Sequence, residues 1–152
     1  MANSILLPIE QLIPTEWVKP RRVATLSQKI LQEGIWTHPI CIEETELFVM
    51  DGHHRLAVAR KLNLKVVPVC LLNYKDIPVY SRKKRFNVSE TAIKQRARLK
   101  RLYPYKTTRH FFPANHPSYA IPISLLQVEP GSGNTEYVLS HTIHLSDFAI
   151  SA

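Results

Sequence analysis

Apolar residues recur along the first half of the chain with two different spacings, and these spacings predict a mixed α/β domain. From Val23 to Leu31 the apolar positions repeat every three or four residues, which is typical of a helix, and Gly34 suits the position after its last turn. Two short apolar runs, 39–43 and 47–50, predict strands. The short acidic segment between these runs predicts a tight hairpin.

The next elements continue the alternation of helices and strands. A helix is predicted over about 53–62, and the strongly apolar run 66–72 predicts a strand. Pro68 lies inside this run, and proline lacks the N–H that a central strand donates, so we expect the strand at an edge or a bulge. Ser89 is a good N-cap for a basic helix that runs to about Leu102.

The two ends of the chain add short extended segments. Residues 5–13 predict an extended stretch, and 105–117 predict an irregular polar one. The segment 120–128 is apolar, 131–134 predict a turn, and 137–145 alternate like a final strand. The sequence therefore predicts one compact α/β (α+β) domain over 1–152, with a small mixed sheet and short flanking helices.

Composition narrows the cellular setting. The chain has 152 residues, of which 45% are hydrophobic and 21% are charged, as expected of a folded domain. No run approaches the roughly 20 apolar residues that span a membrane. The N-terminal residues lack the features of a signal peptide. We expect a cytoplasmic protein with no membrane partner, and the oligomeric state stays open.

Two cysteines, Cys41 and Cys70, lie in apolar β-branched runs. We interpret them as buried reduced thiols. Neither has a Cys-x-x-Cys partner or a second ligand at standard spacing, so no zinc site is expected. His116 is interpreted as structural for the same reason.

The net charge of +8 gathers in one part of the chain. Much of the basic excess lies between Lys75 and Lys106, including the predicted helix that ends near Leu102. Such a surface attracts polyanions or a small phosphorylated ligand. The alternative, a merely solvated helix face, stays open.

The turn Asp51-Gly52-His53-His54-Arg55 carries the densest candidate chemistry. The first N–H groups of a helix have no partner within it, and together with the helix dipole they attract anions. Gly52 allows a ligand to approach closely, and Asp51 can bind Mg²⁺ or hold a hydroxyl. The three residues that follow carry donors for phosphate oxygens. The alternative is a capping Asp51 with exposed histidines, but together these residues favour a phosphate site.

This turn, with segments 56–62 and 66–69 after it, resembles the central motif of the ParB/sulfiredoxin superfamily. It is most similar to the free serine kinases, which phosphorylate the hydroxyl of L-serine and carry Asp-Gly-x-His-Arg here. Sulfiredoxins have a nucleophilic cysteine in this turn and ParB-type CTPases have Gly-Glu-Arg-Arg, whereas this chain has His53. The resemblance implies a ParB/sulfiredoxin-like fold and a kinase that uses Mg²⁺ with ATP or ADP as donor.

The N-terminal segment extends the resemblance. In these kinases an early glutamate is the general base and an arginine follows it, which implies Glu16 as base and Arg22 as a substrate-binding residue, together with His54. Relatives often have histidine where this chain has Thr15. Trp17 either lines the pocket beside Glu16 or belongs to the core, and the core interpretation is favoured.

A third segment, Lys106-Thr107-Thr108-Arg109-His110, offers consecutive donors that suit a nucleotide phosphate. It resembles a Thr-Arg-containing segment of the same kinases. The resemblance implies that the turn also binds the nucleotide phosphates, through Gly52, His53, His54 and Arg55. It implies that Asp51 is a catalytic residue and a ligand of the metal.

Between residues 75 and 104 the chain has less sequence than these kinases, which carry an additional region there. The amino-acid acceptor is therefore less constrained than the phosphoryl chemistry. The alternative function is a non-catalytic ParB-like module that binds nucleotide, or DNA through the basic helix.

Overall fold

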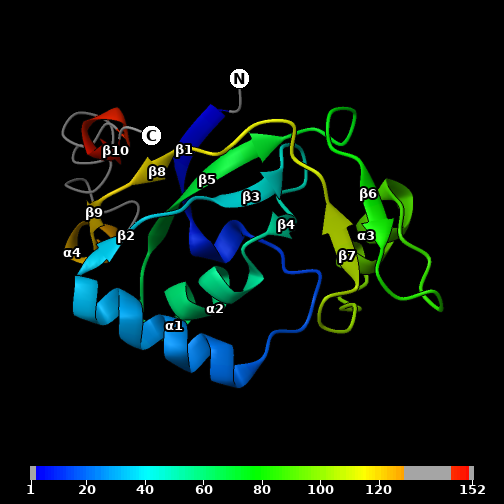
Figure 1. The fold of residues 1–152 in the computed structure, drawn as a ribbon, viewed down its shortest axis with the longest axis horizontal. Helices are drawn as coiled ribbons and strands as arrows, with labels where there is room; N and C mark the ends of the chain where they lie inside the picture. The colour runs from blue at the N-terminus through cyan, green and yellow to red at the C-terminus, as the bar shows by residue number, and fades with distance from the viewer. Residues whose placement is uncertain (1–2, 129–144, 151–152) are drawn as a thin grey trace.

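A small mixed sheet forms the centre of the computed structural model, which describes residues 3–128 and 145–150 (Figure 1). The strand order is β1-β5-β3-β4. Strands β3 and β5 are parallel, whereas β1 and β4 are antiparallel to their neighbours. The bounds are Asn3–Pro8 for β1, Ile40–Glu43 for β3, Val49–Asp51 for β4 and Val66–Leu72 for β5.

Helices α1 and α2 pack together on one side of this sheet, and α3 lies at the other end of the molecule beside β6 and β7 (Figure 1). The helices are α1 Pro20–Glu33, α2 His53–Lys61, α3 Glu90–Arg98 and the single turn α4 Ile123–Leu126. The remaining elements are η1 Ile9–Gln11, β2 Ile35–Trp36, β6 Val79–Ser81, β7 Thr108–His110, β8 Ser118–Tyr119, β9 Ile121–Pro122, η3 Leu145–Phe148 and β10 Ala149–Ile150. None of the described helices is both long and apolar enough to cross a membrane.

The sheet separates two apolar cores, because alternate residues of each strand point to opposite faces. On β3, Ile40 and Ile42 join the core under α1 and α2, whereas Cys41 joins the core shared with α3. On β5, Val69 and Cys70 divide in the same way. Burial on both faces explains why these strands are continuous apolar runs rather than alternating ones.

Pro68 does not lie on an edge strand, so that expectation is wrong. Strand β5 is internal, between β1 and β3. Its pairing with β3 begins only at Val69, whereas Pro68 pairs with Leu6 of β1. A proline is tolerated here because β3 has not yet joined the sheet at this position, so the strand is locally unpaired on that side.

Several predicted elements are confirmed with altered ends. The helix predicted from Val23 begins at Pro20, and the hairpin between β3 and β4 is formed. Ser89 caps α3 by accepting a hydrogen bond from the backbone N–H of Ala92 at 3.1 Å. Helix α3 ends at Arg98 rather than near residue 102, because the chain turns at Lys100, which has a φ of 55°.

The C-terminal third differs more from expectation. The stretch expected to be irregular contains β7, which pairs with β6. The apolar segment 120–128, for which no element was predicted, contains β9 and the turn α4. The predicted turn at 131–134 and nearly all of the predicted strand over 137–145 lie outside the described residues.

Gly52 joins β4 to α2, and its backbone explains the residue choice. It has a φ of 106°, and a Cβ at this position would lie 3.2 Å from Cγ2 of Ile40. Gly34, after α1, also has a positive φ of 69°, but no heavy atom lies within 4 Å of its added Cβ. Gly52 thus meets both a backbone and a packing requirement, whereas Gly34 meets only the first.

We predict that Gly52→Ala lowers the free energy of unfolding by about 2–4 kcal/mol, since strained backbone and a tight core contact add together. Gly34→Ala is the matched control and should cost only about 1–2 kcal/mol. Urea denaturation of both variants measures the difference. Equal losses would show that the contact with Ile40 is unimportant.

Candidate functional site

A cleft of about 420 Å³ opens at the N-terminal end of α2, between the loop 15–17 and the segment 105–108. It brings together parts of all three segments that the sequence singled out. Its lining includes Glu16, Arg22, Asp51, Gly52, His53, His54, Arg55, Lys106 and Thr108, and also Trp17, Leu26, Met50, Arg82 and Tyr105.

Glu16 is held in this cleft by the segment on the opposite side. Its Oε1 accepts a hydrogen bond from the backbone N–H of Thr108 at 2.6 Å and another from the Thr108 hydroxyl. Both donors converge on one oxygen, which fixes the carboxylate. Burial raises the pKa of Glu16 above its usual value, although Thr108 and the charge of Arg82 oppose that rise. A carboxylate with a raised pKa is a stronger base.

The loop that carries Glu16 is fastened by backbone hydrogen bonds to a distant segment. The N–H of Tyr103 donates to the carbonyl of Thr15 at 2.8 Å, and the N–H of Trp17 donates to the carbonyl of Tyr103 at 2.9 Å. Tyr103 is itself fully buried in the core shared with α3. The loop is therefore tied to that core on both sides of Glu16.

His53 fastens the same loop from the other direction. Its Nε2 accepts hydrogen bonds from the backbone N–H groups of Thr15 at 3.0 Å and Glu16 at 3.2 Å. The Thr15 hydroxyl lies 3.1 Å from the same nitrogen and donates to the carbonyl of Val49 at 3.2 Å. Two amides can donate only to an unprotonated nitrogen, so this histidine is neutral with its proton on Nδ1. Burial, followed by the charges of His110 and His54, lowers the pKa of His53 to about 3.

His54 has a similar arrangement one residue later. Its Nε2 accepts the backbone N–H of Lys19 at 3.1 Å, and its ring meets Tyr105 edge-on with centroids 5.5 Å apart. The Tyr105 hydroxyl accepts a hydrogen bond from Nη1 of Arg22. Both histidines were expected to give donors to phosphate, but Nε2 of each accepts a backbone amide from the 15–19 segment. That leaves Nδ1–H as the proton that each ring can donate.

Asp51 is exposed at the tip of β4, and its carboxylate has no hydrogen bond or ion pair with the part of the chain that the structure describes. Four cationic side chains share the cleft with it: Arg22, Arg55, Arg82 and Lys106. Arg55 also donates to the carbonyl of Pro39 at 3.4 Å. The cleft thus combines two carboxylates with a larger number of cations, which suits an anionic ligand.

The segment 106–110 does not act as one unit. Thr107 is fully buried and its hydroxyl donates to the carbonyl of Pro104 at 2.6 Å. His110 lies 2.8 Å from the Tyr74 hydroxyl, and burial lowers its pKa to about 4. Only Lys106 and Thr108 line the cleft. Thr108 and Arg109 line different hollows because successive side chains of β7 point to opposite faces.

Arg109 lines a second hollow, of about 690 Å³, which shares Arg82 with the cleft. Its guanidinium lies 4.8 Å from the ring centroid of Phe111, which meets Tyr80 edge-on at 5.3 Å. Tyr80 and Phe111 are exposed aromatic side chains.

Five residues that line the cleft were not among the predicted site residues, and three of these carry an aromatic or charged side chain. Trp17, for which the core interpretation was favoured over the pocket, is 62% exposed and lines the cleft. Arg82 belongs to a run of basic residues, and nothing in the sequence distinguished it from its neighbours. It lies just after β6, where its backbone N–H donates to the carbonyl of Thr107 at 2.8 Å. Tyr105 was noted only as the start of an irregular stretch.

The basic helix α3 is partly engaged within the molecule. Arg96 lies over the ring of Tyr103 at 4.2 Å and donates to the carbonyl of Leu102 at 3.0 Å. Arg98 binds both carboxylate oxygens of Glu46, at 2.8 and 3.0 Å. These two charges therefore have partners of their own.

No protein-family model matches the chain. It is 34% identical over 76 residues to an ATP-dependent L-serine kinase of Staphylothermus marinus, a match that covers 47% of this chain and 30% of the kinase. The chain thus spans under a third of the length of that relative.

Solved structures match over far more of the chain. A free serine kinase in complex with AMP has a TM-score of 0.75 at 13% identity, covering 82% of this chain and 93% of that chain. SbnI with C-terminal truncation from Staphylococcus aureus has a TM-score of 0.75 at 12% identity, covering 92% and 97%. The fold is that of a free serine kinase. The predicted fold class, a compact α/β domain with a small mixed sheet, is confirmed.

The partly buried, neutral His53 predicts a pH-dependent stability. A histidine whose pKa falls from 6.5 to about 3 on folding binds its proton only in the unfolded chain between those values. The free energy of unfolding therefore falls as the pH drops from about 6.5 towards 3, by up to about 1.4 kcal/mol per pH unit from this group. His53→Gln should reduce that slope, measured by urea denaturation at a series of pH values.

His38→Gln is the matched control. His38 is more exposed to solvent and its pKa is lowered less, first by burial and then by Arg55. An equal change of slope in both variants would contradict the special position of His53.

Proposed function

We propose that this chain is a Mg²⁺-dependent kinase that transfers a phosphoryl group from ATP or ADP to the hydroxyl of a free amino acid. The preferred acceptor in this proposal is L-serine. The observation that carries the proposal is Glu16, whose carboxylate is fixed by Thr108 in the same cleft as the Asp51-Gly52 turn. The local similarity to an L-serine kinase and the shared fold of a free serine kinase support it.

In this proposal Glu16 is the general base. It takes the proton of the serine hydroxyl while the serine oxygen forms a bond to the transferred phosphorus. The bond between that phosphorus and the bridging oxygen breaks, so ATP leaves as ADP, or ADP leaves as AMP. The proton on Glu16 then passes to solvent. Because Thr108 fixes only Oε1 among the contacts of the described residues, Oε2 is the oxygen assigned to this proton transfer.

The N-terminus of α2 is assigned to the transferred phosphoryl group. The N–H groups of His53, His54 and Arg55 precede the first intrahelical bond, which the N–H of Leu56 makes with the carbonyl of Gly52 at 2.9 Å. Such amides and the helix dipole stabilise negative charge as it develops. The Arg55, Arg82 and Lys106 side chains around the cleft add charge-assisted donors, and Arg22 is assigned to the serine carboxylate.

Asp51 fits the metal that this chemistry calls for. Magnesium is commonly held by one or two carboxylates together with substrate phosphates, and Asp51 offers a carboxylate in the cleft with no partner among the described residues. Bound there, the metal would neutralise phosphate charge. Asp51 and the amides of α2 would then hold the phosphates from two sides.

The neighbouring hollow is assigned to the nucleoside. It shares Arg82 with the cleft, and its exposed Tyr80 and Phe111 offer aromatic surface to a base. In this arrangement Arg109 supports the base-binding aromatic pair, and Thr107 and His110 shape the segment from the core side. Of the predicted nucleotide segment, Lys106 and Thr108 would act in the cleft and Arg109 in the neighbouring hollow.

The experiment that tests the function is incubation with a panel of free amino acids and either ATP or ADP, followed by detection of the phosphorylated product. We expect O-phosphoserine with at least one donor, and its amount should depend on serine. No phosphorylated amino acid with any donor, from a folded protein, would overturn the proposal.

We predict that Glu16→Gln lowers kcat about 10²–10⁴-fold, because a positioned general base contributes that much. Nucleotide affinity should be nearly unchanged. Since the base must be deprotonated and its pKa is raised, wild-type kcat should fall on the acid side with an apparent pKa above 4.5. The exposed Glu10 gives the control variant Glu10→Gln. A Glu16→Gln variant within about threefold of wild type would remove Glu16 from the mechanism.

We predict that Asp51→Asn lowers kcat at least about 100-fold at saturating serine and raises the Mg²⁺ concentration needed for half-maximal rate. The melting temperature should be almost unchanged, because this carboxylate has no partner among the described residues. Asp76→Asn, at another exposed position, is the control. Full activity of Asp51→Asn at the wild-type Mg²⁺ requirement would exclude the assigned role.

A further inference from the structure

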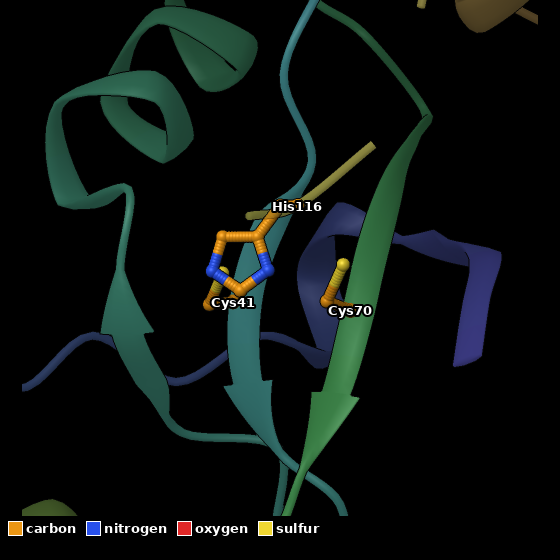
Figure 2. Close-up of side chains that lie close together, drawn as sticks. All are labelled: Cys41, Cys70 and His116. Atoms are coloured by element: carbon orange, nitrogen blue, oxygen red, sulfur yellow. The ribbon is translucent and has the colours of Figure 1, made fainter. Parts of the chain in front are cut away.

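Three residues far apart in the sequence meet on one face of the sheet, and none of them lines the cleft. The ligand atoms of Cys41, Cys70 and His116 all lie within 4.8 Å of one another. Figure 2 shows the His116 imidazole over β3 and β5, with the two cysteine side chains beneath it. Sequence spacing gave no zinc site, because these ligands come from two strands and a later segment rather than from one motif.

The sheet register places the two sulfurs together. Cys41 of β3 and Cys70 of β5 are direct partners on neighbouring parallel strands, and both belong to the core shared with α3. Both are buried, at 1% and 0% exposure. The segment after β7 then passes over them and brings His116 into place, where its ring meets Phe112 edge-on at 4.8 Å.

The His116 side chain gives the second observation. Its Nε2 is buried and has no hydrogen-bond partner within the described ranges 3–128 and 145–150. A buried polar nitrogen normally has a partner, because leaving it unpaired forfeits its hydration. A ring nitrogen that lacks a partner beside two cysteine sulfurs has the position of a metal ligand.

We propose that Cys41, Cys70 and His116 bind one Zn²⁺ ion. Two thiolates and an imidazole form the ligand set that this borderline-soft ion prefers, whereas Mg²⁺ prefers oxygen. In a tetrahedral site with Zn–S bonds of about 2.3 Å and a Zn–N bond of about 2.1 Å, the ligand atoms lie about 3.6–3.8 Å apart. The observed separations of up to 4.8 Å therefore need only a small closing of the side chains.

The fourth ligand is an oxygen. The Ser4 hydroxyl lies 3.2 Å from Sγ of Cys70, which brings an oxygen of β1 to the edge of the cluster. Zinc sites with three protein ligands commonly complete their coordination with water. Either this hydroxyl or a water beside it completes the tetrahedron.

Two other uses of these residues fit less well. A disulfide between Cys41 and Cys70 would leave Nε2 of His116 unpartnered. A nucleophilic cysteine needs access to substrate, but both thiols are buried and neither lines the cleft. The cluster therefore favours a bound ion that holds the segment around His116 against the sheet. Cys41 is also the register partner of Asp51 on β4, so the ion would stiffen the strand that carries Asp51.

The test is metal binding by the full chain after treatment with reductant and chelator. Zn²⁺ is titrated against a chromogenic chelator, and Co²⁺ serves as a spectroscopic probe. We expect one ion per chain with a dissociation constant below about 1 µM. The Co²⁺ form should show thiolate-to-cobalt charge transfer and the visible bands of tetrahedral cobalt.

His116→Gln is the main variant, because its position is only partly buried and the two cysteines remain. It should weaken Zn²⁺ binding about 100-fold or more, whereas His38→Gln, the matched histidine control, should bind like wild type. Melting curves without metal show whether each variant is folded.

Three results would overturn the proposal. One is wild-type Zn²⁺ binding no tighter than that of a Cys41→Ser/Cys70→Ser double variant. Another is a Co²⁺ spectrum of the wild-type protein without thiolate bands. This measurement does not depend on the folding of any variant. The third is a disulfide in the freshly purified protein, seen as an absence of free thiols under denaturing, non-reducing conditions.

Discussion

The candidate site is held together by one ring nitrogen of His53, which accepts hydrogen bonds from two backbone N–H groups. The first residue of α2 thereby fixes the loop that carries Glu16, since the N–H groups of Thr15 and Glu16 both point at Nε2. The position of α2 is in turn set by Gly52, whose backbone allows the strand to turn directly into the helix. Glu16 and the anion-binding end of α2 are therefore parts of one rigid unit. Phosphoryl transfer asks a protein mainly for such positioning and for electrostatic stabilisation.

The second constraint comes from the far side of the cleft. Thr108 fixes the Glu16 carboxylate, and Tyr103 pairs with the backbone on both sides of it. Tyr103 lies in the segment that connects α3 to β7, and Thr108 is the first residue of β7. The loop 15–17 is thus held between α2 and a segment about ninety residues later in the chain. This closure explains why a short chain can present a defined cleft.

The sequence predicted the elements with strong periodicity, and the reasons for the misses are physical. The helices and the strands β3 and β5 follow from their apolar spacing, whereas β6 and β7 have three residues each and leave no pattern. The turn at Asp51 was recognisable from its residue types. Whether His53 donates or accepts a hydrogen bond was not, because that depends on which backbone amides reach it. Cys41, Cys70 and His116 meet only through sheet register and a returning segment, which sequence spacing does not report.

The central claim is that a serine oxygen attacks phosphorus in this cleft with Glu16 as base, and isotope labelling tests it most directly. L-Serine carrying ¹⁸O in its hydroxyl is incubated with nucleotide, Mg²⁺ and the protein, and the product is examined by ³¹P NMR. The account predicts O-phosphoserine with the label retained in the oxygen between carbon and phosphorus, and almost no product from Glu16→Gln. Product that has lost the label, or equal product from the variant, would contradict it.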